Sequence, residues 1–344
     1  MTFLLSINEI LTKFVCKPID KCKKNIAIVM GGYSSEAEIS LKSGDVVYNS
    51  LDANKYALYK VYIFKDRWFV KLDTQEYKID KEDFSFVKKD IKVKFDCVFN
   101  AIHGNPGENG ALVAYFDLLG IKHTSAPFYQ MSLTFNKRDT LSVVKEYGIQ
   151  TANSYYMHQR DEINTVKIIQ KVGLPCFVKP NRSGSSFGIS KVYKEENLED
   201  AIMKACKEDE EILIESFLDG KEVSVGIIEY QGKIEVLPIT EIVSENDFFD
   251  YEAKYKGKSK EITPARISDV EKKKVINTAR KVYRVLNMSG FSRSEFILVD
   301  GEPYFLEINT VPGMTEESLL PQQAKEASIS LTDLFDNAIQ MALN

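Results

Sequence analysis

Two strand-like segments on either side of Asp300-Gly301 constrain the fold of this chain most, because each carries two polar side chains spaced two residues apart. These side chains are Arg293 and Glu295 before the turn, and Glu307 and Asn309 after it. Side chains at this spacing lie on one face of a β-strand. The pattern therefore predicts a β-hairpin with one polar face. Apolar residues on the two segments are expected to face a buried core: Phe296, Leu306 and Ile308.

The register of this hairpin depends on its turn. With a three-residue loop over residues 300–302, Glu295 lies opposite Glu307. Arg293 then lies opposite Asn309, whereas a two-residue turn would break this register. Opposed carboxylates repel each other, and a divalent cation removes the repulsion. Two carboxylates and an amide oxygen are hard ligands, for which Mg²⁺ bound to nucleotide phosphates is the natural occupant. The alternative is a surface hairpin with Arg–Glu pairs, which stabilise a fold only weakly.

The N-terminal third shows strands that end in glycine-rich turns. The apolar run over residues 25–30 is followed by two glycines and then a helical pattern that begins near Glu36. A second strand-like run, over residues 95–102, ends in His103 and another glycine-rich turn. Alternating strands and helices up to about residue 122 predict a parallel α/β domain, whose ligand edge lies at the carboxyl ends of the strands. Glu36 and His103 are therefore candidate binding residues, although a surface acid that compensates the helix dipole is the alternative for Glu36.

A loop rich in small residues follows Lys179, which ends an apolar strand over residues 175–180. Residues 181–186 read NRSGSS, and their backbone N–H groups could surround phosphate oxygens. A lysine at the end of an apolar strand is costly to bury unless it meets an anion. The loop is not a Walker A motif, and the alternative is a solvated hairpin turn.

Residues 244–264 show no clear hydrophobic period and include several aromatic residues together with Lys254 and Tyr255. Long loops of this kind are usually functional or disordered. A lid that excludes water from a reactive intermediate is the functional interpretation. The alternative is a loop that its aromatic residues anchor to the surface.

Composition excludes several classes of protein. The chain has 344 residues, which suits two or three domains, and its formal net charge of −5 offers no basic field for nucleic acid or a membrane surface. Five scattered cysteines without a CxxC pair favour reduced thiols in a cytoplasmic protein. Residues 1–24 are expected to form an appended helix or tail, because no positive residues precede the short apolar start.

In their order along the chain, these motifs resemble those of the D-alanine–D-alanine ligase family. The matching segments run from about Asn25 to the C-terminus: GGYSSEAEIS, AIHGNPGENG, FVKPNRSGSSFGISKV, EEILIESFLDGKEVSV, DYEAKY, RSEF and FLEINTVPGMTEESLLP. The resemblance implies an ATP-grasp fold, α/β and α+β, in which two α+β domains hold ATP beside a Rossmann-like N-terminal domain. The implied parts are an extension (1–24), the Rossmann-like domain (25–122), a central ATP-grasp subdomain (123–209) and a C-terminal catalytic subdomain (210–344) with a lid loop (244–264).

The resemblance also implies roles for individual residues. Those implied to bind ATP are Lys137, Lys179, Ser183, Ser186, Glu215, Leu218, Glu222 and Lys254. Two Mg²⁺ ions, which Mn²⁺ could replace, would be held by Glu295, Glu307 and Asn309. The D-alanine substrates would contact Glu36, His103, Arg293, Gly313, Ser318 and Leu319. The residues implied to act in catalysis are Glu36, Ser185, Arg293 and Tyr255.

The implied reaction is the ATP-dependent ligation of two D-alanines through an acyl phosphate, for peptidoglycan precursor synthesis. The implied partners are ATP, D-alanine and a second copy of the chain, with no nucleic acid and no membrane. Tyr255 favours D-alanine as the second substrate over D-lactate or D-serine, since related depsipeptide ligases tend to lack this tyrosine. The motifs would also suit an ATP-grasp ligase that acts on a different amino acid, or a catalytically silent nucleotide-binding protein. Three positions depart from the common pattern of the family: Ser183, Ser216 and Glu295.

Overall fold

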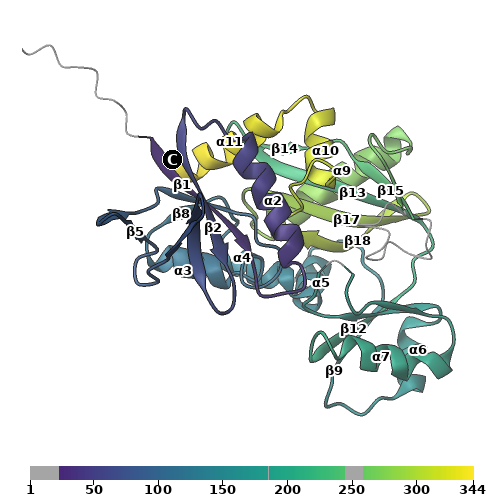
Figure 1. The fold of residues 1–344 in the computed structure, drawn as a ribbon. Coiled ribbons are helices and arrows are strands. Elements are labelled where there is room, and N and C mark those ends of the chain that lie inside the picture. Colours follow the sequence, from purple (N-terminus) through teal and green to yellow (C-terminus); the bar gives the residue numbers. More distant parts are fainter. Residues whose placement is uncertain (1–22, 185, 245–258) are drawn as a thin grey trace, which may run out of the picture.

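The computed structural model describes residues 23–184, 186–244 and 259–344 (Figure 1). Figure 1 shows a purple and blue N-terminal part on one side of the green C-terminal sheet, and a teal central part below that sheet. Ser185, Lys254, Tyr255 and the N-terminal extension lie outside the described residues, except for the last two residues of the extension.

The N-terminal part is a six-stranded sheet in the order β4-β3-β2-β1-β7-β8. Its strands are β1 (Lys24–Gly31), β2 (Tyr56–Ile63), β3 (Trp68–Leu72), β4 (Gln75–Lys78), β7 (Cys97–Asn100) and β8 (Lys122–His123). The neighbouring strands β2, β1, β7 and β8 pair in parallel, which confirms the predicted α/β topology. Strands β3 and β4, which the sequence did not suggest, extend the sheet at one end with antiparallel pairing. Strands β5 (Phe86–Lys88) and β6 (Ile91–Val93) form a separate small antiparallel hairpin.

Helices cover both faces of this sheet because the β1 side chains are apolar on both sides. Ile26, Ile28 and Met30 pack with α2 (Ala37–Ser50) and α11 (Leu331–Leu343). Ala27 and Val29 pack on the opposite face with α3 (Ala111–Leu118). The first of these cores also contains residues of the six-stranded C-terminal sheet, so the two parts share buried apolar surface.

The central part is an antiparallel sheet in the order β11-β10-β12-β9. Its strands are β9 (Ser154–His158), β10 (Cys176–Pro180), β11 (Ser190–Val192) and β12 (Glu211–Ser216), and α6 (Thr165–Val172) and α7 (Leu198–Ala205) share a core with them. The short 3₁₀ helix η1 (Glu195–Asn197) precedes α7. The expected subdomain boundary between residues 209 and 210 would separate β12 from the two strands with which it pairs. We therefore propose that this subdomain extends to Ser216.

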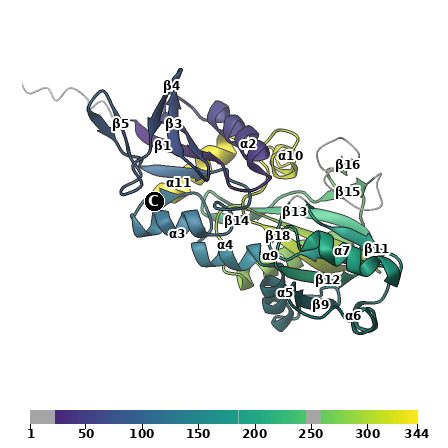
Figure 2. The ribbon, with the colours of Figure 1, turned by 60° about the horizontal axis from the view of Figure 1, so that its bottom comes forward.

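The C-terminal sheet runs β16-β15-β13-β17-β18, with β14 paired to β13. Its strands are β13 (Lys221–Tyr230), β14 (Lys233–Val236), β15 (Thr240–Ser244), β16 (Ser259–Ile262), β17 (Ser292–Val299) and β18 (Glu302–Asn309). Helices α4 (Phe128–Phe135), α5 (Lys137–Glu146) and α9 (Asp269–Val285) share one core with it, and α10 (Leu319–Glu326) contacts β13 (Figure 2). The expected loop over residues 244–264 is too long, because residues 259–262 form the edge strand β16.

The hairpin of β17 and β18 has the predicted pairing of Glu295 with Glu307, but its turn and its register differ from the prediction. Val299 pairs with Glu302, so the turn is the two-residue Asp300-Gly301, and both residues have positive φ (51° and 75°). The predicted three-residue loop is therefore wrong. A β-bulge then shifts the register between Glu295 and Phe296, and it places Glu295 opposite Glu307 as expected.

Leu306 is the extra residue of this bulge, because Phe296 pairs with Phe305 and Glu295 pairs with Glu307. Phe305 and Ile308 are buried in the core, whereas Leu306 lines the same cavity as Glu307. The expectation that Leu306 faces the core is wrong, since the bulge places two consecutive side chains on one face.

Candidate active site

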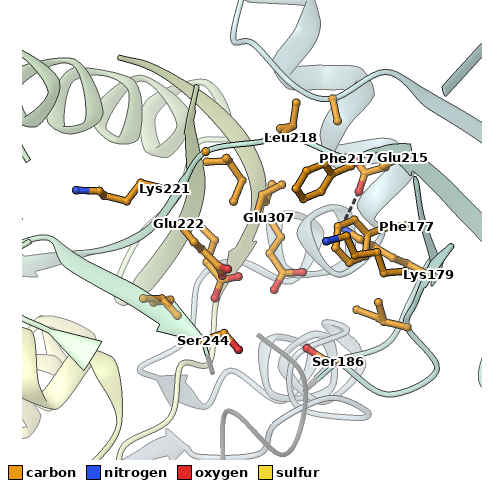
Figure 3. A pocket seen from close by; sticks show the side chains of 18 of the residues that line it. Phe177, Lys179, Ser186, Glu215, Phe217, Leu218, Lys221, Glu222, Ser244 and Glu307 are labelled. Carbon is orange, nitrogen blue, oxygen red and sulfur yellow. Dashed lines mark hydrogen bonds and ion pairs between the residues drawn. The ribbon is translucent and has the colours of Figure 1, made fainter. Parts of the chain in front are cut away.

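A cavity of about 550 Å³ lies between the central sheet and the C-terminal sheet. Strands β10 and β12 line one side, and β13, β15, β17 and β18 line the other. Figure 3 shows the carboxylates of Glu222 and Glu307 near the middle of this space, with Phe177 and Phe217 at one end. Sequence-predicted ATP contacts that line this cavity are Lys137, Lys179, Ser186, Glu215, Leu218 and Glu222.

Two lysines of the central part extend toward the acidic side chains. Lys137, at the start of α5, places Nζ 2.6 Å from the carbonyl oxygen of Ser183 and 3.3 Å from Oε2 of Glu307. Lys179, near the end of β10, donates from Nζ to Oε2 of Glu215 at 2.8 Å. Burial lowers the pKa of Lys179, but the carboxylate of Glu215 outweighs this effect and the pKa is raised. Lys179 is therefore a permanent cation inside the cavity.

The aromatic end of the cavity has an unpaired acceptor. Oε1 of Glu215 is buried and has no hydrogen-bond partner among the described residues. Phe177, Phe217 and Leu218 line the cavity near it, and the ammonium group of Lys191 lies 4.2 Å from the centre of the Phe217 ring. An apolar slot with one buried acceptor suits a flat heterocycle that carries an amino group. The hydroxyl of Ser216 bonds the backbone of Asn153, and so does not offer a contact of the kind a lysine would make.

The opposite wall carries two of the three predicted metal ligands, Glu295 and Glu307. Together with Glu222, a predicted ATP contact, they line the cavity from the adjacent strands β13, β17 and β18. Glu295 pairs with Glu307 on one side and with Ser224, two residues after Glu222, on the other. Asn309 has a buried amide nitrogen without a partner among the described residues. No group of three or more His, Cys, Asp or Glu side chains in the described part of the chain could hold a metal ion. Two carboxylates and an amide instead form an oxygen set, which fits a hard cation that retains water or phosphate ligands.

Arg293 lies two residues before Glu295 on β17 and forms an ion pair with it. Its guanidinium also donates to Oγ of Ser224 at 3.2 Å. Only 14% of the Arg293 side chain is exposed, so its charge acts in a largely dry environment. Ser224, which sequence reasoning missed, is buried on β13 and fixes the direction of this guanidinium.

Glu36 lies where loops from two parts of the fold converge. It is the N-cap residue of α2 and is only 7% exposed. A Cβ atom on Gly104 would lie 2.7 Å from Oε2 of Glu36, and one on Gly184 would lie 2.7 Å from Oε1. A side chain at either position would displace the Glu36 carboxylate, and Gly104 also has a positive φ of 63°. The carboxylate therefore contacts the turn after His103 and the loop after Lys179, so the alternative of a surface acid is wrong.

His103 connects α2 to the segment after β18. Its Nε2 lies 2.9 Å from Oγ of Ser43, and its Nδ1 lies 2.8 Å from the carbonyl oxygen of Val311. Burial lowers the pKa of His103, which favours the neutral ring. The ring is thus a fixed hydrogen-bonding group beside Glu36.

The predicted contacts of the second substrate lie at the start of α10. Ser318 is the N-cap residue, and its Oγ lies 2.8 Å from Oγ1 of Thr315. A Cβ atom on Gly313 would lie 2.6 Å from Oγ of Ser318, so a side chain there would displace this hydroxyl. The loop and the first turn of α10 therefore bring Gly313, Ser318 and Leu319 together, and backbone N–H groups at a helix N-terminus favour an anion.

The geometry of the sheets and the cavity defines the fold class of this protein. Two α+β parts enclose a cavity that presents lysines from one sheet and carboxylates from the other, beside a doubly covered parallel sheet. That is the ATP-grasp fold, with its Rossmann-like N-terminal domain, as the sequence predicted.

Comparisons with known proteins make the assignment narrower. The family described as D-ala D-ala ligase N-terminus matches residues 25–126, and D-ala D-ala ligase C-terminus matches residues 142–340. A D-alanine–D-alanine ligase of Flavobacterium johnsoniae is 64% identical over 321 residues, which are 93% of this chain and 99% of that protein. This chain belongs to the D-alanine–D-alanine ligase family.

Solved structures share the fold at lower identity. D-alanyl-alanine synthetase A of Vibrio cholerae superposes with a TM-score of 0.84 at 26% identity, covering 93% of this chain and 98% of that one. The VanG D-Ala:D-Ser ligase of Enterococcus faecalis gives a TM-score of 0.83 at 29% identity, with 93% and 99% covered. The same fold thus occurs in ligases whose names differ in the second substrate.

Proposed function

We propose that this protein joins two D-alanine molecules to D-alanyl-D-alanine at the expense of ATP, for cell-wall precursor synthesis. One observation carries the proposal: the cavity between the two sheets has Lys137 and Lys179 on one side and Glu295 and Glu307 on the other, and the buried Glu36 carboxylate lies against the loop after Lys179. The membership of the family, and the 64% identity to a D-alanine–D-alanine ligase, support D-alanine as the substrate.

ATP would occupy the cavity with its base at the aromatic end. Glu215 and Leu218 would border the base, and Glu222 would accept from the ribose hydroxyls. Lys137 and Lys179 would bind the phosphates, and Ser183 and Ser186 would cover them together with Lys254 of the lid. The free acceptor on Glu215 supports this orientation, because the exocyclic amine of adenine is a donor.

A divalent metal would be held by Glu295, Glu307 and Asn309, and we propose two Mg²⁺ ions with Mn²⁺ as a substitute. When bound, such ions neutralise the charge that develops on the transferred phosphoryl group. Glu295 replaces the shorter aspartate often found at this position. Its pairing with Glu307 across the hairpin supports a shared metal, and it also forms an ion pair with Arg293.

The first D-alanine would bind with its ammonium on Glu36 and its carboxylate toward the phosphates. A carboxylate is a poor electrophile, and it becomes reactive once ATP converts it into an acyl phosphate. The amine of the second D-alanine then attacks the carbonyl carbon, and the phosphate leaves. Arg293 would donate to the oxyanion of that step, a contribution of about 3 kcal/mol for one well-placed donor.

The carboxylate of the second D-alanine would bind the N-terminus of α10 at Ser318 and Leu319, with Gly313 in close contact. His103 would line the first-substrate pocket as a neutral ring. Ser185 and Tyr255 would complete a hydrogen-bonded closure over Glu36, and the position of Gly184 against this carboxylate supports the approach of that loop.

The proposal is tested by incubating the protein with ATP, Mg²⁺ and D-alanine, and by measuring phosphate release and dipeptide mass. We expect one phosphate per dipeptide, and no dipeptide with L-alanine. A preference for D-lactate or D-serine as the second substrate would move the function to the corresponding ligase. ATP binding without D-alanine-dependent turnover would contradict the proposal.

We also infer a homodimer in the cytoplasm that binds neither membranes nor nucleic acid. Exposed apolar side chains on adjacent helices α3 and α4, such as Leu118 and Tyr129, offer a surface for a second copy. None of the helices in the described ranges is long and apolar enough to cross a membrane. Light scattering should give twice the chain mass of 39.1 kDa, and a monomer at working concentrations would contradict this part of the proposal.

A further inference from the structure

Glu108 lies in the loop between β7 and α3 and connects two segments that are far apart in sequence. Its Oε2 accepts from the backbone N–H of Gly104 at 3.2 Å. Its Oε1 accepts from the N–H groups of Thr310 and Val311 at 3.2 and 3.4 Å. One carboxylate therefore fastens the turn after His103 to the segment directly after β18.

The peptide groups around Val311 are held from both sides. Glu108 accepts from the N–H of Val311, while Nδ1 of His103 lies 2.8 Å from its carbonyl oxygen. Farther along the same segment, the N–H of Met314 donates to Oγ of Ser43 at 3.2 Å. The chain from Thr310 to the start of α10 is thus fixed against the N-terminal part, and Glu108 supplies its first two contacts.

This segment has Asn309 at one end and Ser318 at the other. Glu108 is also close enough to Glu36 for the two carboxylates to interact, since burial and then the charge of Glu36 raise the pKa of Glu108 to about 7. A group that costs this much to place in the interior must be compensated by the hydrogen bonds it accepts. Its contacts reach toward the site of each substrate.

We propose that Glu108 is a positioning residue that sets the distance between Glu36 and the loop before α10, and so determines how the second amino acid is aligned with the first. The inference rests on the proposed function, because it assigns Glu36 to the first substrate and the start of α10 to the second. Glu108 itself contacts no reacting atom and acts through the Thr310–Val311 backbone.

Two substitutions separate its contacts. Glu108→Ala removes all three acceptor interactions. Glu108→Gln retains one carbonyl oxygen, which can still accept from Thr310 and Val311, but it presents an NH₂ group to the N–H of Gly104. Glu38→Ala is the matched control, because Glu38 is an exposed acid on α2 in the same part of the fold.

Steady-state kinetics with D-alanine gives separate KM values for the two sites, and calorimetry gives the dissociation constant of ATP. For Glu108→Ala we expect the KM of the second D-alanine to rise about tenfold or more, with ATP affinity within about threefold of the parent. Glu108→Gln should lie between the parent and Glu108→Ala, and Glu38→Ala should match the parent. Amide exchange at Thr310 and Val311 should accelerate in Glu108→Ala.

Two results would overturn the proposal. One is a folded Glu108→Ala protein with both KM values and the exchange of residues 310–311 unchanged. The other is an equal loss of ATP affinity, thermal stability and both KM values, which would indicate a general structural role. If Glu108→Ala does not fold, the same measurements on Glu108→Gln decide the question. Absence of D-alanine turnover in the parent protein would refute the proposed function instead, while the exchange rates would still test the contact.

Discussion

The ammonium group of Lys179 donates to Oε2 of Glu215 at 2.8 Å, and the other carboxylate oxygen of Glu215 has no partner among the described residues. The two side chains are only 15% and 3% exposed. Removing water from both charges is costly, so the pair is poor as a stabilising device. It is better suited to hold a cation and a free acceptor ready for a nucleotide, with the phosphates near Lys179 and the base near Glu215.

Replacing Lys179 should therefore affect stability and nucleotide binding in different ways. Lys179→Met leaves Glu215 buried without its partner, which should cost about 3 kcal/mol of unfolding free energy. The double variant Lys179→Met/Glu215→Gln should recover most of that loss, because no uncompensated charge remains. Calorimetry should show that both variants bind ATP more weakly than the parent protein, including the double variant whose stability is restored. The exposed Lys194→Ala is the control, and restored ATP binding in the double variant would exclude Lys179 as a phosphate ligand.

Glu307 is expected to be essential for turnover but not for folding. Glu307→Gln retains the size of the side chain and removes the charge that faces Lys137 and the predicted metal. We expect turnover to fall by roughly 10²–10³-fold, the scale for losing one preorganised electrostatic group. Glu302→Gln, at an exposed position on the same strand, is the control. Near-normal turnover in Glu307→Gln, at saturating Mg²⁺, would remove Glu307 from the metal site.

Arg293 should act mainly in the transition state. Arg293→Ala should lower kcat by roughly 10²–10³-fold, as found for the loss of single oxyanion donors. The dissociation constant of ATP should change far less, because Arg293, unlike Glu295, does not line the cavity proposed for ATP. Arg280→Ala, an exposed position on α9, serves as the comparison. If ATP affinity falls as much as kcat, Arg293 contributes to nucleotide binding rather than to the oxyanion.

Asp209 should stabilise the base of the loop after Lys179 in a pH-dependent way. It accepts from the backbone N–H of Arg182 at 2.7 Å and pairs with the guanidinium through both oxygens. Burial raises the pKa of Asp209, but the Arg182 hydrogen bonds outweigh it, and the pKa lies below 3.8. The contribution is therefore complete above about pH 4 and is lost as the pH falls through the folded-state pKa.

Asp209→Asn should accordingly lower the unfolding free energy by about 1–2 kcal/mol at pH 7. The effect is moderate because the Arg182 side chain is 44% exposed, although Asp209 is only 6% exposed. The difference from the parent should shrink when urea unfolding is repeated at pH 3. Asp66→Asn, at an exposed position, should show no such trend. A difference that is constant from pH 7 to pH 3 would show that the charge of Asp209 is not responsible.

The hairpin of β17 and β18 shows how far local sequence patterns reach. The alternation of Arg293 with Glu295, and of Glu307 with Asn309, predicted a hairpin with a polar face, but the expected pairing of Glu295 with Glu307 holds only because a bulge offsets the wrong turn length. It could not predict the bulge at Leu306, because a bulge adds one residue whose place depends on the packing of Phe305 and Ile308 in the core.

Contacts between distant segments were beyond such patterns. Gly104 and Gly184 both approach Glu36, which brings together three loops from different parts of the fold. The sequence around neither glycine indicates that Glu36 is its partner. Glu108 stood within the segment AIHGNPGENG, but its partners Thr310 and Val311 lie about 200 positions away. The sheet to which residues 211–216 belong likewise depends on their pairing with β9 and β10, and on this ground we propose a subdomain boundary after Ser216.

Transfer of oxygen from D-alanine to phosphate tests the central claim most directly. The protein is supplied with ATP, Mg²⁺ and D-alanine labelled with ¹⁸O in its carboxylate, and the phosphate is analysed by mass spectrometry. If the first carboxylate is activated as an acyl phosphate, each dipeptide formed leaves one ¹⁸O atom in the released phosphate. Released phosphate that contains no ¹⁸O, because its fourth oxygen came from water, would contradict the account.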